Sequence, residues 1–123
     1  MLMTAPMLGP KDFEYPSIML SGVVDHGMYL HFKNCLSNAP QQGLVVVEIS
    51  TLGGDPEIAR LMGEDIRFHS DLYPERRLVF LGRTAVYSAG ETFMSFFAPE
   101  NRSVRRGTRL MSHERLSLQN IEL

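Results

Sequence analysis

A serine and a histidine, Ser88 and His113, have surroundings that favour acyl-transfer chemistry. Ser88 lies between a short apolar run, 78–81, and a segment, 89–97, whose apolar residues recur at helical spacing. A hydroxyl at such a strand-to-helix junction lies beside unpaired backbone N–H groups, which stabilise negative charge. A nucleophile that attacks a carbonyl needs donors of this kind, and His113, which follows the short strand candidate 109–112, can act as its base. The pattern indicates a hydrolytic site, although a serine here is more commonly a helix cap.

Two consecutive glycines, Gly53 and Gly54, form the second informative feature. They follow an apolar, β-branched run at 44–49 and precede Asp55-Pro56, a typical helix start with a capping aspartate and a proline in the first position. Glycines between a buried strand and a helix allow backbone conformations that other residues resist, and they allow a ligand to approach the main chain closely. They predict a tight turn at which a ligand can contact the backbone.

The elements that must position these residues alternate between strands and helices. The run 44–49 is typical of a strand covered on both faces, as in a parallel sheet between helices. Apolar positions recur at helical spacing from 58 to 68, so this segment and the flanking strands form a βαβ unit. Upstream, 17–24 is typical of a strand and 28–36 of an amphipathic helix. The predicted fold class is therefore α/β.

Four stretches together resemble the Clp protease proteolytic subunit (ClpP) family in order and in spacing. They are 18–25 (IMLSGVVD), 45–54 (VVVEISTLGG), 84–90 (TAVYSAG) and 109–113 (RLMSH). The resemblance implies the ββα spiral that ClpP shares with the crotonases, and a serine-type endopeptidase with Ser88 as nucleophile and His113 as base. It further implies an oxyanion hole made by the N–H groups of Gly54 and Ala89, with Gly53 supporting the turn. We expect no cofactor and no metal, because His26 and His31 are not at the spacing of a helical zinc pair and no cysteine cluster accompanies them.

The chain departs from the ClpP pattern near both candidate groups. Thr51-Leu52 stands where the family usually has Ser-Pro, and Glu114-Arg115 stands where it has Gln-Pro. A Ser–His pair works best with a carboxylate that orients the imidazole, and in the family this acid lies well downstream of the histidine. None of the acids that we considered matches that position; they are Asp25, Asp55, Asp65, Asp71 and Glu114.

We therefore expect a flexible N-terminal segment, 1–16, followed by a ClpP-like domain, 17–123, that is truncated at the C-terminus, with the triad acid outside this chain. Two alternatives stay open. The missing acid favours a catalytically inactive ring subunit or remnant. A crotonase-type acyl-CoA enzyme would share the fold and the oxyanion donors without needing the Ser–His pair.

The composition of the chain limits the class of protein and the cellular compartment to which it can belong. A net charge of -2, with 44% hydrophobic and 21% charged residues, is ordinary for a globular protein and gives no general attraction to nucleic acid or membranes. The single cysteine fits a reducing compartment, and no apolar run approaches the ~20 residues of a membrane span. We expect a cytoplasmic protein. The resemblance implies a peptide or unfolded-protein substrate, a homo-oligomeric ring and an AAA+ ATPase unfoldase as partner.

A local basic run lies between residues 102 and 115. Such a run can indicate contact with phosphate or RNA. Because the chain has no tryptophan and acidic residues lie nearby, we interpret the run as subunit salt bridges or a solvated edge. Its members are Arg102, Arg105, Arg106, Arg109 and Arg115.

Overall fold

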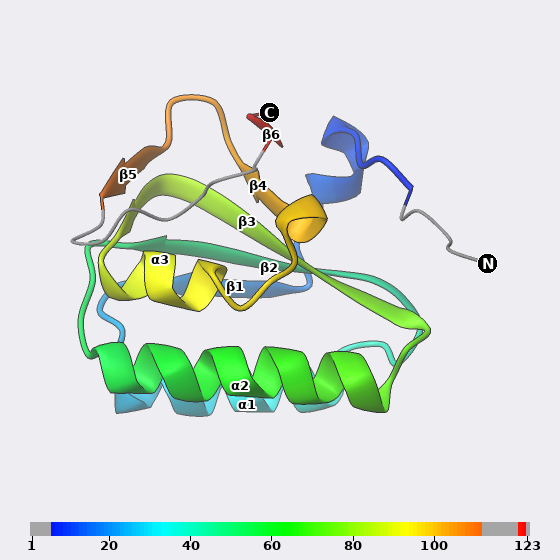
Figure 1. Ribbon diagram of the computed structural model, residues 1–123, viewed down its shortest axis with the longest axis horizontal. Coiled ribbons are helices and arrows are strands. Elements are labelled where there is room, and N and C mark those ends of the chain that lie inside the picture. Colours follow the sequence, from blue (N-terminus) through cyan, green and yellow to red (C-terminus); the bar gives the residue numbers. More distant parts are fainter. Residues whose placement is uncertain (1–5, 112–120, 123) are drawn as a thin grey trace.

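The computed structural model describes residues 6–111 and 121–122. A parallel sheet has helices packed against one face (Figure 1). In chain order the elements are η1 (Pro10–Phe13), β1 (Ile18–Ser21), α1 (His26–Asn38), β2 (Gly43–Thr51), α2 (Pro56–Leu72), β3 (Arg76–Tyr87), α3 (Ala89–Met94), η2 (Pro99–Asn101), β4 (Arg102–Val104), β5 (Arg109–Met111) and β6 (Ile121–Glu122). The strand order is β1-β2-β3-β4-β6, and β5 also pairs with β3.

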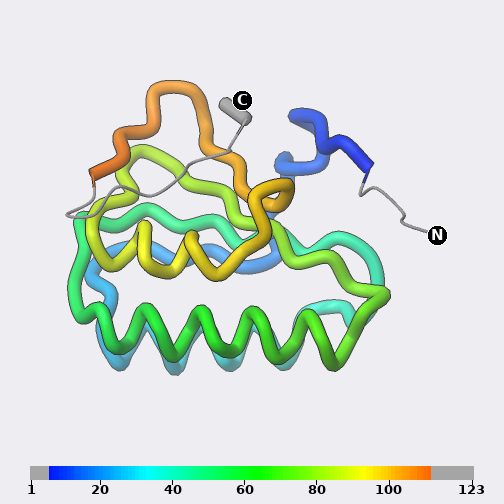
Figure 2. The backbone as a smooth tube through the Cα atoms, viewed as in Figure 1, coloured from blue at the N-terminus to red at the C-terminus, as the bar shows by residue number. Residues whose placement is uncertain are grey.

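The predicted βαβ units are confirmed. Figure 2 shows the chain passing from β1 through α1 to β2, and from β2 through α2 to β3, with both helices below the sheet. Each helix begins at an aspartate, as the sequence indicates: the Met28 N–H donates to Asp25 Oδ1 at 2.9 Å, and the Glu57 N–H donates to Asp55 Oδ1 at 2.9 Å. Within the described residues, no helix has the length and apolar character needed to cross a bilayer.

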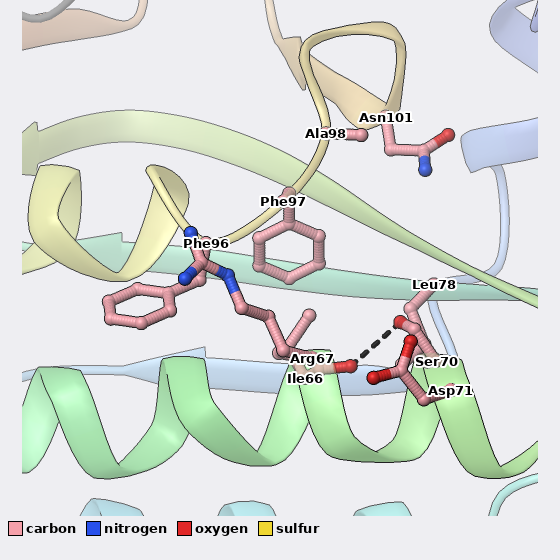
Figure 3. Close-up of a pocket in the computed structure, with 9 residues that line it drawn as sticks. All are labelled: Ile66, Arg67, Ser70, Asp71, Leu78, Phe96, Phe97, Ala98 and Asn101. Carbon is pink, nitrogen blue, oxygen red and sulfur yellow. Dashed lines mark hydrogen bonds between the residues drawn. The ribbon is translucent and has the colours of Figure 1, made fainter.

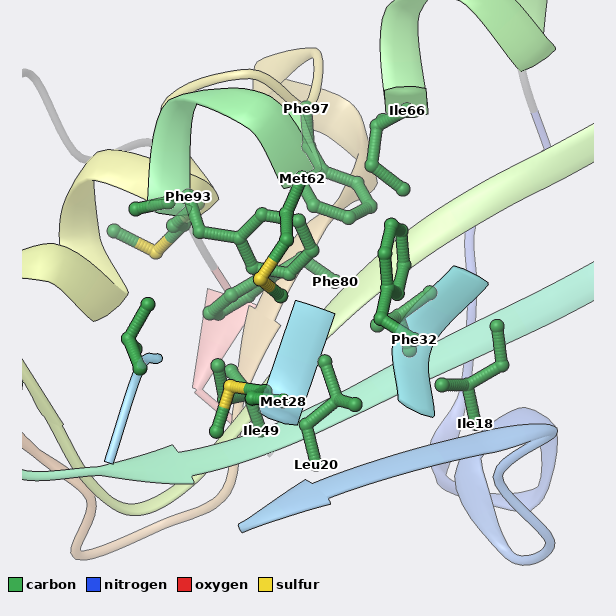
Figure 4. Close-up of a cluster of buried hydrophobic side chains, with 14 of the residues drawn as sticks. Ile18, Leu20, Met28, Phe32, Ile49, Met62, Ile66, Phe80, Phe93 and Phe97 are labelled. Atoms are coloured by element: carbon green, nitrogen blue, oxygen red, sulfur yellow. The ribbon is translucent and has the colours of Figure 1, made fainter. Parts of the chain in front are cut away.

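The main core lies between the sheet and its helices. Val45, Val47 and Ile49 of β2 point towards the helices, as the period of two along a strand requires. In the same cluster, aromatic rings pack edge to face: the Phe93 ring centroid lies 5.6 Å from that of Phe32 and 5.3 Å from that of Phe97 (Figure 4). This cluster attaches α1 and α3 to the same part of the sheet.

A smaller cluster covers the opposite face of the sheet, as predicted for a strand buried on both sides. Phe13 of η1 is 2% exposed and packs with Val46, Val79 and Leu81. The sequence pattern missed this contact because one anchoring phenylalanine produces no periodicity. Within the expected flexible segment 1–16, η1 is thus held to the sheet by a buried ring.

Strand β3 is longer than the predicted strand at 78–81. It continues beyond the end of that apolar run through a bulge between Gly82 and Val86. Ile49 of β2 lies opposite Gly82, whereas Thr51 lies opposite Val86, and Thr84 has a φ of 70°. Two extra residues on β3 therefore oppose β2 at this point. β4 pairs with β3 before the bulge and β5 pairs with it after, so β3 continues to the candidate site.

The helix after Ser88 is shorter than the predicted segment 89–97. α3 ends at Met94, and i→i+3 bonds follow, among them Phe97 N–H to the Met94 carbonyl at 3.0 Å. The Arg102 guanidinium ends the segment by donating to the carbonyls of Phe97 (2.9 Å) and Ser95 (3.2 Å). Burial lowers the pKa of Arg102, and nearby Glu100 opposes this shift.

Candidate active site

Ser88 occupies a strained turn between β3 and α3. Its φ of 50° and ψ of -106° lie in a region that residues with a Cβ rarely adopt. The side chain makes no capping hydrogen bond to α3, so the common reason for a serine before a helix does not apply here. A strained serine at a sharp strand-to-helix turn is the arrangement that exposes a nucleophile in hydrolases with such elbows.

The end of β5 lies directly against this serine. The Ser88 N–H donates to the Met111 carbonyl at 2.7 Å, extending the parallel pairing of Tyr87 with Met111. The pairing thus brings the chain next to Ser88 two residues before His113. His113 itself lies outside the described residues, so its role as base stays a prediction.

The Gly53–Gly54 turn packs against the same serine. A Cβ added to Gly53 would lie 3.5 Å from the Ser88 Cβ, so the two turns are in contact. Gly54 has a φ of 148°, and a Cβ there would lie 2.3 Å from the Val24 carbonyl oxygen. This close approach, together with the positive φ, requires glycine at position 54.

The two predicted oxyanion donors flank Ser88. In the bridge beside Gly54, the Val24 N–H donates to the Gly53 carbonyl at 2.9 Å and the Asp55 N–H donates to the Val24 carbonyl at 2.8 Å, so the Gly54 N–H takes no part. Ala89 is the first residue of α3, where an N–H has no partner inside the helix. Among the described residues, neither N–H has a hydrogen-bond acceptor.

Thr51 is a positioning residue that the sequence analysis noted only as a departure from the ClpP pattern. Its Oγ1 accepts a hydrogen bond from the Gly53 N–H at 3.0 Å, and its hydroxyl donates to the Gly53 carbonyl at 3.2 Å. Its methyl group fills the space above Gly90, where an added Cβ would lie 2.6 Å from Thr51 Cγ2. Thr51 therefore connects the glycine turn to α3. The sequence signal for its hydrogen bonds was a threonine placed two residues before Gly53.

Replacing Thr51 with valine should destabilise the fold by about 1–3 kcal/mol, because the Gly53 N–H would lose its buried acceptor, whereas the Gly53 carbonyl keeps the Val24 N–H as a donor. Urea denaturation of the two proteins measures the difference. Thr51→Ser keeps the hydroxyl and should retain most of the lost stability. A stable Thr51→Val together with a destabilised Thr51→Ser would assign the effect to the methyl group instead.

Three of the four described aspartates that were considered for the acid have structural contacts. Asp25 and Asp55 cap α1 and α2, and Asp65 lies 3.7 Å from Lys33 Nζ. Glu91, in the first turn of α3, is a buried acid that the sequence analysis did not single out. Within the described part of the chain, no three His, Cys, Asp or Glu side chains gather closely enough to hold a metal ion.

A separate cavity of about 280 Å³ lies between α2 and the segment after α3 (Figure 3). Phe97 and Leu78 form its apolar wall, and the Arg67 guanidinium lies 4.5 Å from the Phe96 ring centroid. The Ser70 hydroxyl donates to the Ile66 carbonyl at 2.7 Å and is thereby satisfied. The lining contains no Ser–His pair and does not include Ser88, so this cavity is distinct from the candidate active site.

Comparison with solved structures identifies the architecture. The chain is similar to ClpP1 from Listeria monocytogenes, with a TM-score of 0.62 and 20% identity over 76% of this chain and 54% of that one. It is also similar to an asparagine-to-aspartate mutant of that ClpP1, with a TM-score of 0.64 and 20% identity over 81% and 57% of the two chains. The fold is ClpP-like. No family model matches the sequence, and no curated protein matches it.

The ClpP-like fold confirms the predicted α/β class and the spiral architecture. The chain spans little more than half the length of these two ClpP1 structures. The likeness at 20% identity concerns the fold, whereas the roles of Ser88, His113, Gly54 and Ala89 remain predictions.

Proposed function

We propose that this chain is a ClpP-like serine peptidase subunit that hydrolyses peptide bonds at Ser88. The observation that supports this most is the strained Ser88 turn in contact with the Gly53–Gly54 turn. A serine with no cap bond, beside two N–H groups without acceptors among the described residues, has the components of a nucleophile and its oxyanion hole.

The proposed reaction proceeds by acyl transfer. Ser88 Oγ attacks the peptide carbonyl while His113 takes the hydroxyl proton, and the N–H groups of Gly54 and Ala89 donate to the resulting oxyanion. His113 then gives its proton to the leaving amine as the C–N bond breaks. Water, deprotonated by the same imidazole, hydrolyses the acyl-enzyme and restores the serine. A further group, outside the described residues, would orient His113.

The assembly and setting belong to the same proposal. We propose that residues 17–123 belong to the ClpP-like domain, that the subunit forms a homo-oligomeric ring, and that a AAA+ unfoldase delivers unfolded protein to it in the cytoplasm. The support is the ClpP-like fold together with the motifs at 45–54 and 84–90.

A fluorophosphonate probe tests the nucleophile directly, because it reacts with activated serines only. We expect a covalent adduct that peptide mapping by mass spectrometry assigns to Ser88, and no adduct in Ser88→Ala. Labelling that is unchanged in this variant would refute the proposal. Absence of any labelling would instead support the catalytically inactive ring subunit, which the structural roles of Asp25, Asp55 and Asp65 also favour.

A further inference from the structure

A basic pocket of about 310 Å³ lies at the edge of the sheet, beside the β3 bulge. Arg83 of β3, Arg105 and Arg106 of the β4–β5 loop, and Arg109 at the start of β5 line it. In Figure 1 this loop is the orange arch between β4 and β5. Arg105, Arg106 and Arg109 belong to the basic run that the sequence led us to interpret as subunit salt bridges or a solvated edge, whereas the fold gathers them, with Arg83, around one concavity.

The backbone that carries these arginines is held in place without a ligand. The Arg105 N–H donates to the Gly82 carbonyl at 2.8 Å, and the Thr108 N–H donates to the Arg105 carbonyl at 3.0 Å, which closes a turn. Gly107, at φ 85°, occupies the turn position that requires a positive φ. Because the loop is already ordered by these bonds, a ligand would not have to order it on binding.

The charge in this pocket is only partly compensated by the described residues. Arg83 Nη1 lies 3.6 Å from Glu48 Oε1, and Arg105 Nη2 donates to the Phe13 carbonyl at 3.5 Å. Arg106 and Arg109 have no acceptor within the part of the chain that the structure describes. None of the described residues that line the pocket is an acid, and the whole chain carries a net charge of -2, so this positive charge is a local feature. Like charges around a concavity repel one another, and a bound anion relieves that repulsion.

We propose that this pocket binds a compact oxyanion, namely a phosphoryl or carboxylate group of a free ion or of a peptide. Guanidinium groups match the paired oxygens of both groups in bidentate geometry. The volume is at the lower end of the range for small-molecule sites, which suits a group the size of pyrophosphate. The site is independent of the proposed peptidase chemistry, although the two are near: Arg109 pairs with Ala85, three residues before Ser88, or roughly 10 Å along a strand.

Isothermal titration of the 123-residue chain with sodium pyrophosphate, at low ionic strength, tests the site. We expect saturable binding that weakens at least tenfold in the double variant Arg106→Gln, Arg109→Gln. Arg106→Lys keeps the charge but loses the bidentate guanidinium, so its affinity for pyrophosphate should lie between those of the wild type and the double variant. Arg60→Gln is the matched control, because Arg60 is an exposed arginine on α2 that pairs with Glu57 and lies outside the pocket. Circular dichroism verifies that each variant is folded.

A second arm distinguishes the two sources of the anion. Titration with a glutamate-rich hexapeptide, compared with pyrophosphate, shows whether peptide carboxylates or phosphate groups bind more tightly. Either result supports the site if the double variant abolishes binding of the tighter ligand. The proposal is overturned if pyrophosphate does not bind, or if it binds the double variant and the wild type equally. A change of oligomeric state in the variant without any anion binding would also overturn it, in favour of salt bridges between subunits.

Discussion

Ser88→Ala should lower kcat/KM for an unstructured peptide at least roughly a thousandfold, because loss of the nucleophile in such sites removes most of the rate enhancement. The structure predicts that this loss is not accompanied by unfolding. Since the Ser88 side chain makes no cap bond, the free energy of unfolding should change by less than about 1 kcal/mol. A fluorogenic peptide assay and thermal unfolding of the same preparations measure both quantities.

Two further substitutions sharpen this test. Ser37→Ala removes a hydroxyl that bonds only the Asn34 carbonyl on the exposed side of α1, and it should leave turnover unchanged. Ser88→Gly should be as inactive as Ser88→Ala but more stable than wild type by about 1 kcal/mol, because glycine adopts a φ of 50° without strain. Wild-type turnover in Ser88→Ala would exclude this residue as the nucleophile.

Gly54→Ala should reduce activity by roughly a hundredfold to a thousandfold, the usual effect of losing one oxyanion donor. The added Cβ would lie 2.3 Å from the Val24 carbonyl oxygen, so the turn must move and the Gly54 N–H must leave its position. Strain of this kind typically also costs about 1–3 kcal/mol of stability. Kinetics with the fluorogenic peptide and urea denaturation measure the two effects.

Gly22→Ala is the matched control for this substitution. Gly22 also has a positive φ, 101°, but nothing lies within 4 Å of an added Cβ, so the variant carries backbone strain without the collision. We expect it to lose about 1 kcal/mol of stability and to keep its activity. If Gly22→Ala and Gly54→Ala lose activity equally, the close approach of Gly54 to Val24 is not the cause of the activity loss in Gly54→Ala.

Much of the helix-covered part of the fold could be predicted, because its signals are local. The β-branched run of β2 and the Asp55-Pro56 start of α2 act through burial and capping, which depend on neighbouring residues only. The Gly53–Gly54 turn was predicted for the same reason. The structure adds the cause, which is the contact of Gly54 with the Val24 backbone.

The features that could not be predicted depend on partners distant in sequence. β4 was missed because its burial comes from pairing with β3 and not from an apolar run of its own. The bulge at Thr84 and the anchoring of Phe13 likewise arise from contacts across the sheet. The role of Thr51 also depends on a distant residue, because its methyl group occupies the space that a Cβ at Gly90 would fill.

The bulge in β3 separates two parts of one continuous strand. Before it, Leu78 and Phe80 pack into the core; after it, Val86 still packs into the core, while the strand pairs with β5 and leads into Ser88. Sequence changes before the bulge should therefore alter stability alone, whereas changes after it should alter stability and the geometry of the Ser88 turn together. In related proteins, the part of the strand that follows the bulge is consequently constrained twice.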